Sequence, residues 1–163
     1  MLTKQPNSIS NSAMALLRIS IGIIYLWFGA LKFFHGYSPA EALATQTIHK
    51  LTFGMLNDTV EINLLAVWEC SIGILFIIGR WMKPVLVFFF LHMICTFTPL
   101  IFFPDQTFRY MPYGLSLAGQ YIIKNIVIIS AGIVLWQAEK EKSKRFITGL
   151  DKSLYAQIEA VTI

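Results

Sequence analysis

Residues 64–77 of the chain read LLAVWECSIGILFI, and thirteen of these fourteen residues are apolar or small. The exception is Glu69. This stretch lies inside a longer apolar run, residues 60–79, which has the length of a helix that crosses a bilayer. A carboxylate at the centre of such a helix costs roughly 3 kcal/mol on insertion scales. Glu69 therefore requires a partner, a function, or both.

The whole chain has the composition of an integral membrane protein. Of its 163 residues, 56% are hydrophobic and only 13% are charged, whereas a soluble domain is about 25% charged. The mean hydropathy is +0.63. The net charge of +4 comes largely from scattered basic residues and does not indicate a nucleic-acid partner. The first apolar run is too long for a cleaved signal peptide and carries Arg18 and Lys32.

Four segments are long and apolar enough to span a bilayer as helices. They cover residues 13–34, 60–79, 84–103 and 115–137, approximately. These segments predict an all-α, integral membrane four-helix bundle. Pro99 and Pro104 should bend or end the third span, because proline cannot donate a backbone hydrogen bond.

The basic residues predict the orientation of the bundle in the membrane. One side holds the larger set: Lys4, Arg80, Lys83, Lys140, Lys142, Lys144, Arg145 and Lys152. The other side holds Lys50 and Arg109, with Lys32 near its edge. By the positive-inside rule, we expect both termini to be cytoplasmic.

Segments outside the spans carry their own signals. SPAE at residues 38–41 resembles a capping box and predicts a short helix between spans one and two. That helix either lies in the membrane interface or packs on the bundle. The aromatic, proline-rich loop 98–114 is either an interface segment or a lid. Residues 138–163 form a basic tail that is an amphipathic helix, a partner-docking helix or solvated chain.

Each predicted span has one face that gathers polar and small residues, and these faces should turn inward because ionisable groups avoid lipid. The candidate pocket and ion-pair residues on these faces are Arg18, Tyr25, Glu69, His92, Tyr121, Lys124 and Asn125. The simplest partner for the buried carboxylate is a cation, which gives an Arg18–Glu69 or a Glu69–Lys124 pair. Such a pair either holds the helices together or belongs to a pocket that binds a small polar head group or passes protons.

The sequence carries no motif for a metal or haem. His92 is the only histidine at membrane depth, so a haem would lack a second histidine ligand. Cys70 and Cys95 lie inside apolar runs without the spacing of a metal site. Small apolar filler is the simpler role for both cysteines, and a redox pair is the alternative. We expect no metal.

Three stretches resemble a known family: LLRISIGIIYLWFGALKFF (residues 16–34), WECSIGILFIIG (residues 68–79) and LAGQYIIKNIVIISAGIVL (residues 117–135). Together they are similar to the DoxX-like superfamily of small four-span membrane proteins, and most similar to its YkgB/RclC-type branch. The resemblance covers residues 13–137. The arginine, glutamate and lysine-asparagine of the family pattern fall at Arg18, Glu69, Lys124 and Asn125.

This resemblance implies a bundle in the bacterial inner membrane with a role in redox or oxidative-stress physiology. Some relatives are subunits of a thiosulfate:quinone oxidoreductase, which makes a quinone a candidate ligand and membership of a quinone-linked enzyme a candidate role. Two other functions remain: a non-enzymatic adaptor that docks a membrane or cytoplasmic partner protein, and a small-solute or lipid transporter. Four spans are few for transport unless the chain forms a homo-oligomer.

Overall fold

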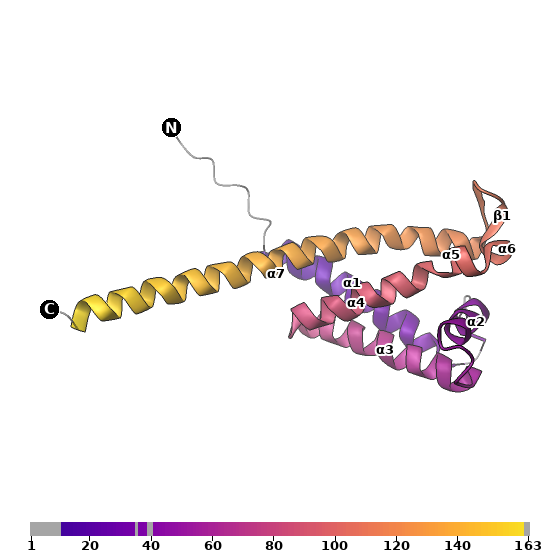
Figure 1. Cartoon of the computed structure of the whole chain (residues 1–163), viewed down its shortest axis with the longest axis horizontal. Coiled ribbons are helices and arrows are strands. Elements are labelled where there is room, and N and C mark those ends of the chain that lie inside the picture. Colours follow the sequence, from indigo (N-terminus) through magenta and orange to yellow (C-terminus); the bar gives the residue numbers. More distant parts are fainter. Residues whose placement is uncertain (1–10, 35, 39–40, 162–163) are drawn as a thin grey trace.

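The structure is a computed structural model, and it describes residues 11–34, 36–38 and 41–161 (Figure 1). In chain order the elements are α1 (Asn11–Leu31), α2 (Glu41–Leu51), α3 (Asp58–Ile78), α4 (Met82–Phe97), α5 (Pro99–Phe102), α6 (Pro104–Thr107), β1 (Phe108–Tyr110), β2 (Gly114–Leu115) and α7 (Leu117–Val161).

Four helical segments in the described part of the chain have the length and hydropathy of membrane spans. They are Asn11–Leu31, Asp58–Ile78, Met82–Phe102 and Leu117–Gly149. The prediction of an all-α bundle with four such helices is confirmed. Large apolar side chains such as Trp27, Ile94 and Val127 are more than half exposed on the outside of the bundle. A bilayer would cover these side chains.

Helices α1 and α3 form the closest pair in the bundle, and glycines make this possible. A Cβ atom on Gly73 would lie 2.6 Å from the backbone nitrogen of Leu26, and one on Gly22 would lie 2.8 Å from the carbonyl oxygen of Gly73. A Cβ atom on Gly29 would come similarly close to Glu69 and Cys70. Small residues at a helix crossing allow this backbone approach, which maximises van der Waals contact in lipid.

Helix α4 connects the α1–α3 pair to α7. Its buried face, which includes Leu86, Phe89 and Met93, fills the centre of the bundle. Phe89 packs against Tyr25 of α1 and Phe76 of α3, with ring centroids 5.6 and 5.5 Å apart. Gly132 of α7 lies against the same Phe89 ring, where a Cβ atom would collide with it. One aromatic side chain thus contacts all three other spans.

The third span ends as its prolines predict. Helix α4 ends at Phe97, Pro99 begins the single turn α5, and Pro104 begins α6. A two-stranded antiparallel hairpin of β1 and β2 then leads into α7. These elements lie together with α2 at one end of the bundle (Figure 1).

The SPAE segment leads into a helix, as predicted. Glu41 starts α2, and its carboxylate accepts a hydrogen bond from the backbone nitrogen of Gly36 at 2.9 Å. Pro39 lies outside the described residues. Leu43 and Thr47 are the buried residues of α2, which packs against α3 and α5. This contact supports the packed helix rather than a helix lying free in the interface.

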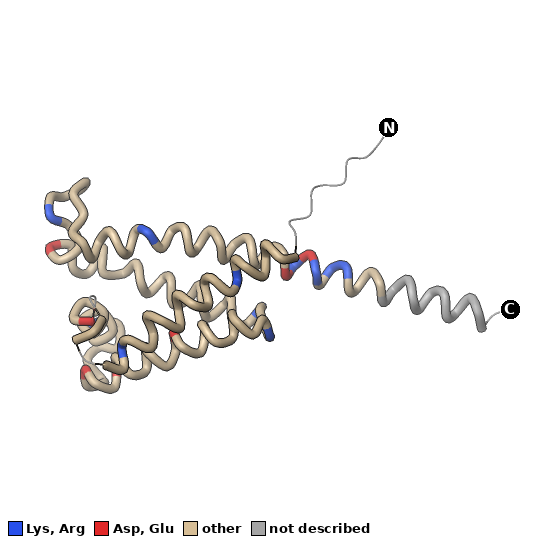
Figure 2. Tube along the Cα trace, turned by 180° about the vertical axis from the view of Figure 1, so that it is seen from behind, with Lys and Arg blue, Asp and Glu red and all other residues tan. Residues whose placement is uncertain are grey.

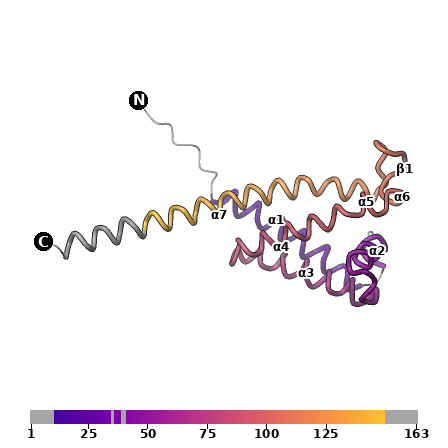
Figure 3. The backbone as a smooth tube through the Cα atoms, viewed as in Figure 1, coloured from indigo at the N-terminus to yellow at the C-terminus, as the bar shows by residue number. Residues whose placement is uncertain are grey.

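Helix α7 continues without a break from the fourth span into the basic tail. The helix passes residue 137, where the predicted span ends, and extends far beyond the other spans (Figures 1 and 3). Figure 2 shows basic residues on this extension where it leaves the bundle. The exposed Phe146 and Ile147 lie on the same extension.

Candidate functional site

Four polar side chains, from α1, the turn after it, α3 and α4, form one connected network inside the bundle. The Nζ atom of Lys32 lies 2.5 Å from Oε2 of Glu69, and Nε2 of His92 lies 3.1 Å from Oε1 of the same carboxylate. The Tyr25 hydroxyl lies 3.0 Å from Nδ1 of His92. The charged side chains of Lys32 and Glu69 are each only 10% exposed. Glu69 therefore has two partners, one in the turn after α1 and one on α4.

The direction of the hydrogen bonds follows from the chemistry of the groups. An ionised carboxylate only accepts, so His92 donates its Nε2 hydrogen to Glu69. In the neutral imidazole Nδ1 is then an acceptor, and the Tyr25 hydroxyl donates to it. The chain of donors thus runs from Tyr25 through His92 to Glu69. Lys32 and Glu69 cancel each other's charge, which lowers the cost of burying both.

The sequence places Lys32 next to Glu69 through a glycine. Gly29 lets α1 approach α3 so closely that a Cβ atom on it would lie 2.9 Å from Cβ of Glu69. Lys32 follows Gly29 by three residues, directly after the end of α1, and its backbone nitrogen donates to the carbonyl oxygen of Gly29 at 3.1 Å, which keeps it on the same side as Gly29. Its Nζ atom also lies 3.4 Å from the carbonyl oxygen of Phe28.

Aromatic rings hold His92 in position. The ring of Tyr25 stands edge-on to the imidazole with centroids 5.3 Å apart, and the Trp68 ring lies at 6.4 Å. Trp68 packs in turn on Phe88. Edge-to-face contacts of this kind add about 0.5–1.5 kcal/mol to a pair beyond its buried area. They fix the imidazole plane that both hydrogen bonds require.

The network borders a cavity of about 460 Å³. Its polar lining is Tyr25, Lys32, Ser38, Glu69, His92, Thr96, Tyr121, Lys124 and Asn125. Its apolar lining is Ile24, Phe28, Leu43, Met93, Ala118, Ile122 and Ile128. This volume falls within the range of about 300–1,000 Å³ that small-molecule sites occupy, and the mixture of apolar walls with a few polar groups is typical of them.

The mouth of this cavity lies between α1 and α7. Phe28 of α1 and Tyr121 of α7 border the cavity and are each about half exposed, at 49% and 51%. Lys124 is also exposed, and its Nζ atom lies 5.5 Å from the centroid of the Tyr121 ring. Because both helices are membrane-span candidates, the mouth would open toward lipid.

A smaller cavity of about 170 Å³ borders the same network. It shares Lys32, Glu69, His92 and Thr96 with the larger one and extends under α2, where Thr47 and Leu51 line it. The polar network therefore borders two hollows: one opens between α1 and α7, and one lies beneath the α2 helix.

Six of the seven candidate residues from the sequence border the larger cavity, and Arg18 does not. The guanidinium of Arg18 instead donates to the carbonyl oxygens of Phe76 and Ile77, the latter at 2.9 Å. These carbonyls belong to the last turn of α3, where carbonyl oxygens have no intrahelical N–H group to accept from. The predicted Arg18–Glu69 pair is therefore wrong: Arg18 caps a helix end.

The alternative pair, Glu69–Lys124, is also wrong. Both oxygens of Glu69 are occupied by Lys32 and His92, while Lys124 lies on the exposed side of α7 above Tyr121. Sequence reasoning passed over Lys32 because it stands at the predicted membrane edge. Its position on the face of Arg18, Gly22, Tyr25 and Gly29 was the signal that could have found it.

The two cysteines occupy different surroundings. Both are free thiols. Cys70 faces α1, where its sulfur lies 3.9 Å from the carbonyl oxygen of Leu26 and close to Gly29. Cys95 lines the smaller cavity. The structure therefore favours separate packing roles over a redox pair.

Comparisons with known proteins add no assignment. No protein-family model, no curated protein and no solved structure matches the chain. The function therefore has to be argued from the geometry of this site.

Proposed function

We propose that this protein is a membrane-embedded binding protein for a small amphipathic molecule with a quinone-like head group. The observation that carries the proposal is the network Tyr25–His92–Glu69–Lys32 at the wall of a cavity with a lipid-facing mouth. An isoprenoid or acyl tail would leave between Phe28 and Tyr121 into lipid, while the head group would reach the polar wall.

The polar wall supplies the chemistry that a quinone head group needs. The two carbonyl oxygens of a quinone accept hydrogen bonds, and the cavity offers donors in Asn125 and Lys124. The hydrogen-bonded series from Tyr25 to Glu69 gives a proton acceptor and a proton donor beside the same head group. Ionisable groups inside a membrane bundle are functional candidates by default, and here three of them contact one another.

The resemblance to the DoxX-like superfamily supports a role for this binding in redox or oxidative-stress physiology at a bacterial inner membrane. In that setting the chain would serve as the quinone-holding subunit of a membrane oxidoreductase, and a partner subunit would exchange electrons with the bound molecule. This role extends the binding proposal and depends on it.

The first experiment is mass spectrometry of small molecules retained by the full chain in native-lipid particles. We expect wild-type protein to retain a defined quinone and Glu69→Gln to lose it. Glu139→Gln is the matched control, since Glu139 lies on α7 outside the cavity and pairs with Lys142. Lys124→Gln is a second test variant that should fold normally because Lys124 is exposed. Only bulk lipid in folded wild-type protein would contradict the proposal.

One observation favours the adaptor as a second candidate function. Helix α7 extends beyond the bundle and presents the exposed Phe146 and Ile147 beside a basic stretch (Figure 1). An adaptor would lose its co-purifying partner protein on deletion of residues 138–163 and would keep its small-molecule content. The binding protein would show the opposite result with Glu69→Gln.

A further inference from the structure

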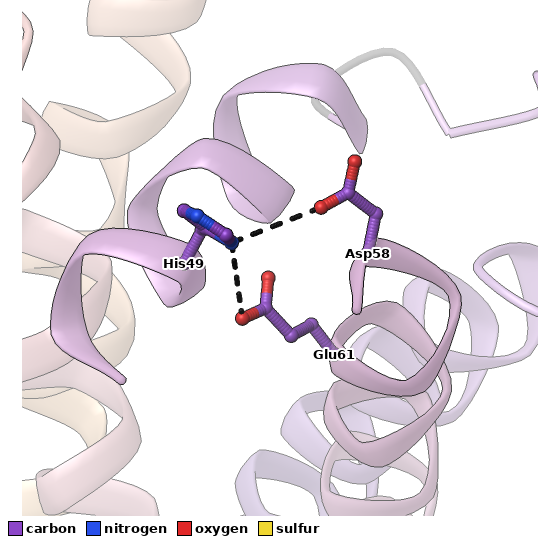
Figure 4. A group of neighbouring side chains, drawn as sticks. All are labelled: His49, Asp58 and Glu61. Carbon is purple, nitrogen blue, oxygen red and sulfur yellow. Dashed lines mark ion pairs between the residues drawn. The ribbon is translucent and has the colours of Figure 1, made fainter. Parts of the chain in front are cut away.

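A second polar cluster lies at the end of the bundle where α2 turns back into α3. His49 stands in the last turn of α2, and Asp58 and Glu61 stand in the first turn of α3 (Figure 4). The Nδ1 atom of His49 lies 3.6 Å from Oε1 of Glu61 and 3.9 Å from Oδ1 of Asp58. None of the three lines the cavities described above.

Glu61 is the unusual member of this cluster. Its side chain is completely buried. Thr52 donates a hydrogen bond to Oε1 at 2.8 Å, but Oε2 has no hydrogen-bond partner among the described residues. A buried carboxylate oxygen without a partner is costly. Figure 4 shows that both oxygens are turned toward the side of the cluster where His49 and Asp58 lie. The orphaned oxygen therefore points to a missing ligand at this place.

The spacing of the three groups suits a single metal ion. One ligand atom from each residue can be chosen so that all three lie within 4.8 Å of one another. Around a zinc ion with bonds of about 2.0–2.2 Å, neighbouring ligand atoms stand about 3.3 Å apart. The side chains of His49 and Asp58 are largely exposed, at 53% and 78% accessible. Rotation of these side chains can therefore bring the ligand atoms from their present separations to the distance that zinc requires.

The turn between α2 and α3 holds the ligands in place. Asn57 caps α3 by accepting a hydrogen bond from the backbone nitrogen of Val60 at 2.9 Å, which fixes the first turn that carries both carboxylates. Gly54 has φ of +71°, and a Cβ atom there would lie 3.1 Å from Nε2 of His49. The glycine thus permits the turn and leaves room for the imidazole.

The surroundings leave the cluster open to an ion. His49 and Asp58 border a surface hollow of about 730 Å³, so water or an ion can reach them. Lys50 is the neighbouring cation, and its Nζ atom lies over the rings of Phe102 and Phe103, 5.1 and 5.4 Å from their centroids. These cation–π contacts give its ammonium group partners other than the two carboxylates.

From these observations we propose that His49, Asp58 and Glu61 bind a divalent metal ion of the zinc type. One imidazole nitrogen and two carboxylates are ligands that zinc accepts, and three protein ligands leave a fourth position for water. This proposal departs from the expectation of no metal. That expectation rested on cysteine and histidine spacing, and the sequence interval from His49 to Asp58 does not match a compact metal motif.

The test is a zinc titration of the full chain in lipid nanodiscs after removal of metal with a chelator. Competition with a chromophoric zinc indicator measures affinity and stoichiometry. We expect one zinc per chain, with affinity at least about tenfold weaker in His49→Gln and in Asp58→Asn. Both residues are exposed, so these variants should fold. Asp105→Asn is the matched control, since Asp105 is an exposed carboxylate on α6 outside the cluster.

A second measurement separates a bound ion from a structural ion pair. Zinc should raise the unfolding temperature of wild type and Asp105→Asn and should leave that of His49→Gln unchanged, because a ligand stabilises only the state that binds it. Equal zinc affinity in wild type and His49→Gln would overturn the proposal. So would the absence of stoichiometric zinc binding to folded wild-type protein, and His49 would then serve as an ion-pair partner of the two carboxylates.

Discussion

The ammonium nitrogen of Lys32 lies 2.5 Å from Oε2 of Glu69, and this contact joins the turn at the end of α1 to α3 inside the bundle. Removing one partner of a buried pair leaves the other charge uncompensated and costs roughly 3–5 kcal/mol, whereas removing both can be nearly neutral. Each of the two charges is therefore tolerated inside the bundle only while its partner is present.

A double-mutant cycle tests this relationship. We expect Lys32→Met and Glu69→Gln each to lower the free energy of unfolding by about 3 kcal/mol or more, and the double variant to lose clearly less than the sum. Glutamine keeps an acceptor for His92, so the cycle isolates the charge. The measurement is equilibrium unfolding in mixed micelles. Additive losses would show that the two side chains are not energetically coupled.

The sequence was sufficient to predict the spans. In lipid every backbone N–H and C=O group must be hydrogen-bonded within the protein, so a long hydrophobic run has few possible structures other than a helix. The sequence also identified the inward faces of α1 and α3, where Tyr25 and Glu69 are buried, but not that of α7, where Tyr121 and Lys124 are exposed. The pairing inside the bundle was not predictable in the same way. Which cation meets Glu69 depends on the close crossing at Gly29, which brings Lys32 from the predicted membrane edge to the carboxylate. Depth counted along straight helices favoured Arg18 and Lys124 instead.

The His49–Asp58–Glu61 cluster escaped sequence reasoning for a similar reason. Its members belong to two helices and meet only because the turn after α2 folds back sharply at Gly54. The buried state of Glu61 is also a property of tertiary packing, since an acidic residue in the first turn of a helix is ordinarily a solvated one that favours the helix dipole.

The hydrogen bond between Tyr25 and His92 leads to a prediction about ligand binding. Tyr25→Phe removes the hydroxyl and keeps the ring packing on Phe89, so the free energy of unfolding should fall by only about 1 kcal/mol. We expect the affinity for a short-tailed benzoquinone to fall by about tenfold, because the imidazole loses the donor that fixes it.

Trp68 provides the readout for this prediction, since its ring lies 6.4 Å from that of His92 and a bound quinone should quench its fluorescence. The other three tryptophans are replaced by phenylalanine for this measurement. Tyr37→Phe serves as the control, because Tyr37 is 72% exposed. Equal quenching curves for Tyr25→Phe and Tyr37→Phe would exclude a role for the hydroxyl.

Arg18 should matter for stability and not for the ligand. Its hydrogen bonds to the carbonyls of Phe76 and Ile77 are charge-assisted, and such bonds contribute about 1.5–3 kcal/mol each. We expect Arg18→Gln to lower the unfolding free energy by about 2 kcal/mol and to leave benzoquinone affinity within twofold of wild type. A loss of ligand affinity with unchanged stability would instead show that Arg18 takes part in ligand binding.

The glycine contacts predict opposite outcomes at two helical positions. Gly73→Val should prevent α1 from packing on α3, since even a Cβ atom would lie 2.6 Å from the backbone of Leu26. We expect a large loss of folded, monodisperse protein on size-exclusion chromatography. Gly149→Ala is the control, because nothing lies within 4 Å of a Cβ atom there. Alanine should be neutral or stabilise α7 by up to about 1 kcal/mol.

The distribution of basic residues makes a prediction about orientation that accessibility labelling can check. The extension of α7 should be cytoplasmic and the β1–β2 hairpin should face the opposite side, because the larger set of basic residues lies with the extension. In a background with Cys70→Ser and Cys95→Ser, single cysteines are introduced as Ser143→Cys and Tyr113→Cys; Tyr113 is 93% exposed. A membrane-impermeant maleimide should label the Tyr113→Cys variant in intact spheroplasts. It should label the Ser143→Cys variant only after permeabilisation, and the reverse pattern would mean that the bundle is inserted the other way.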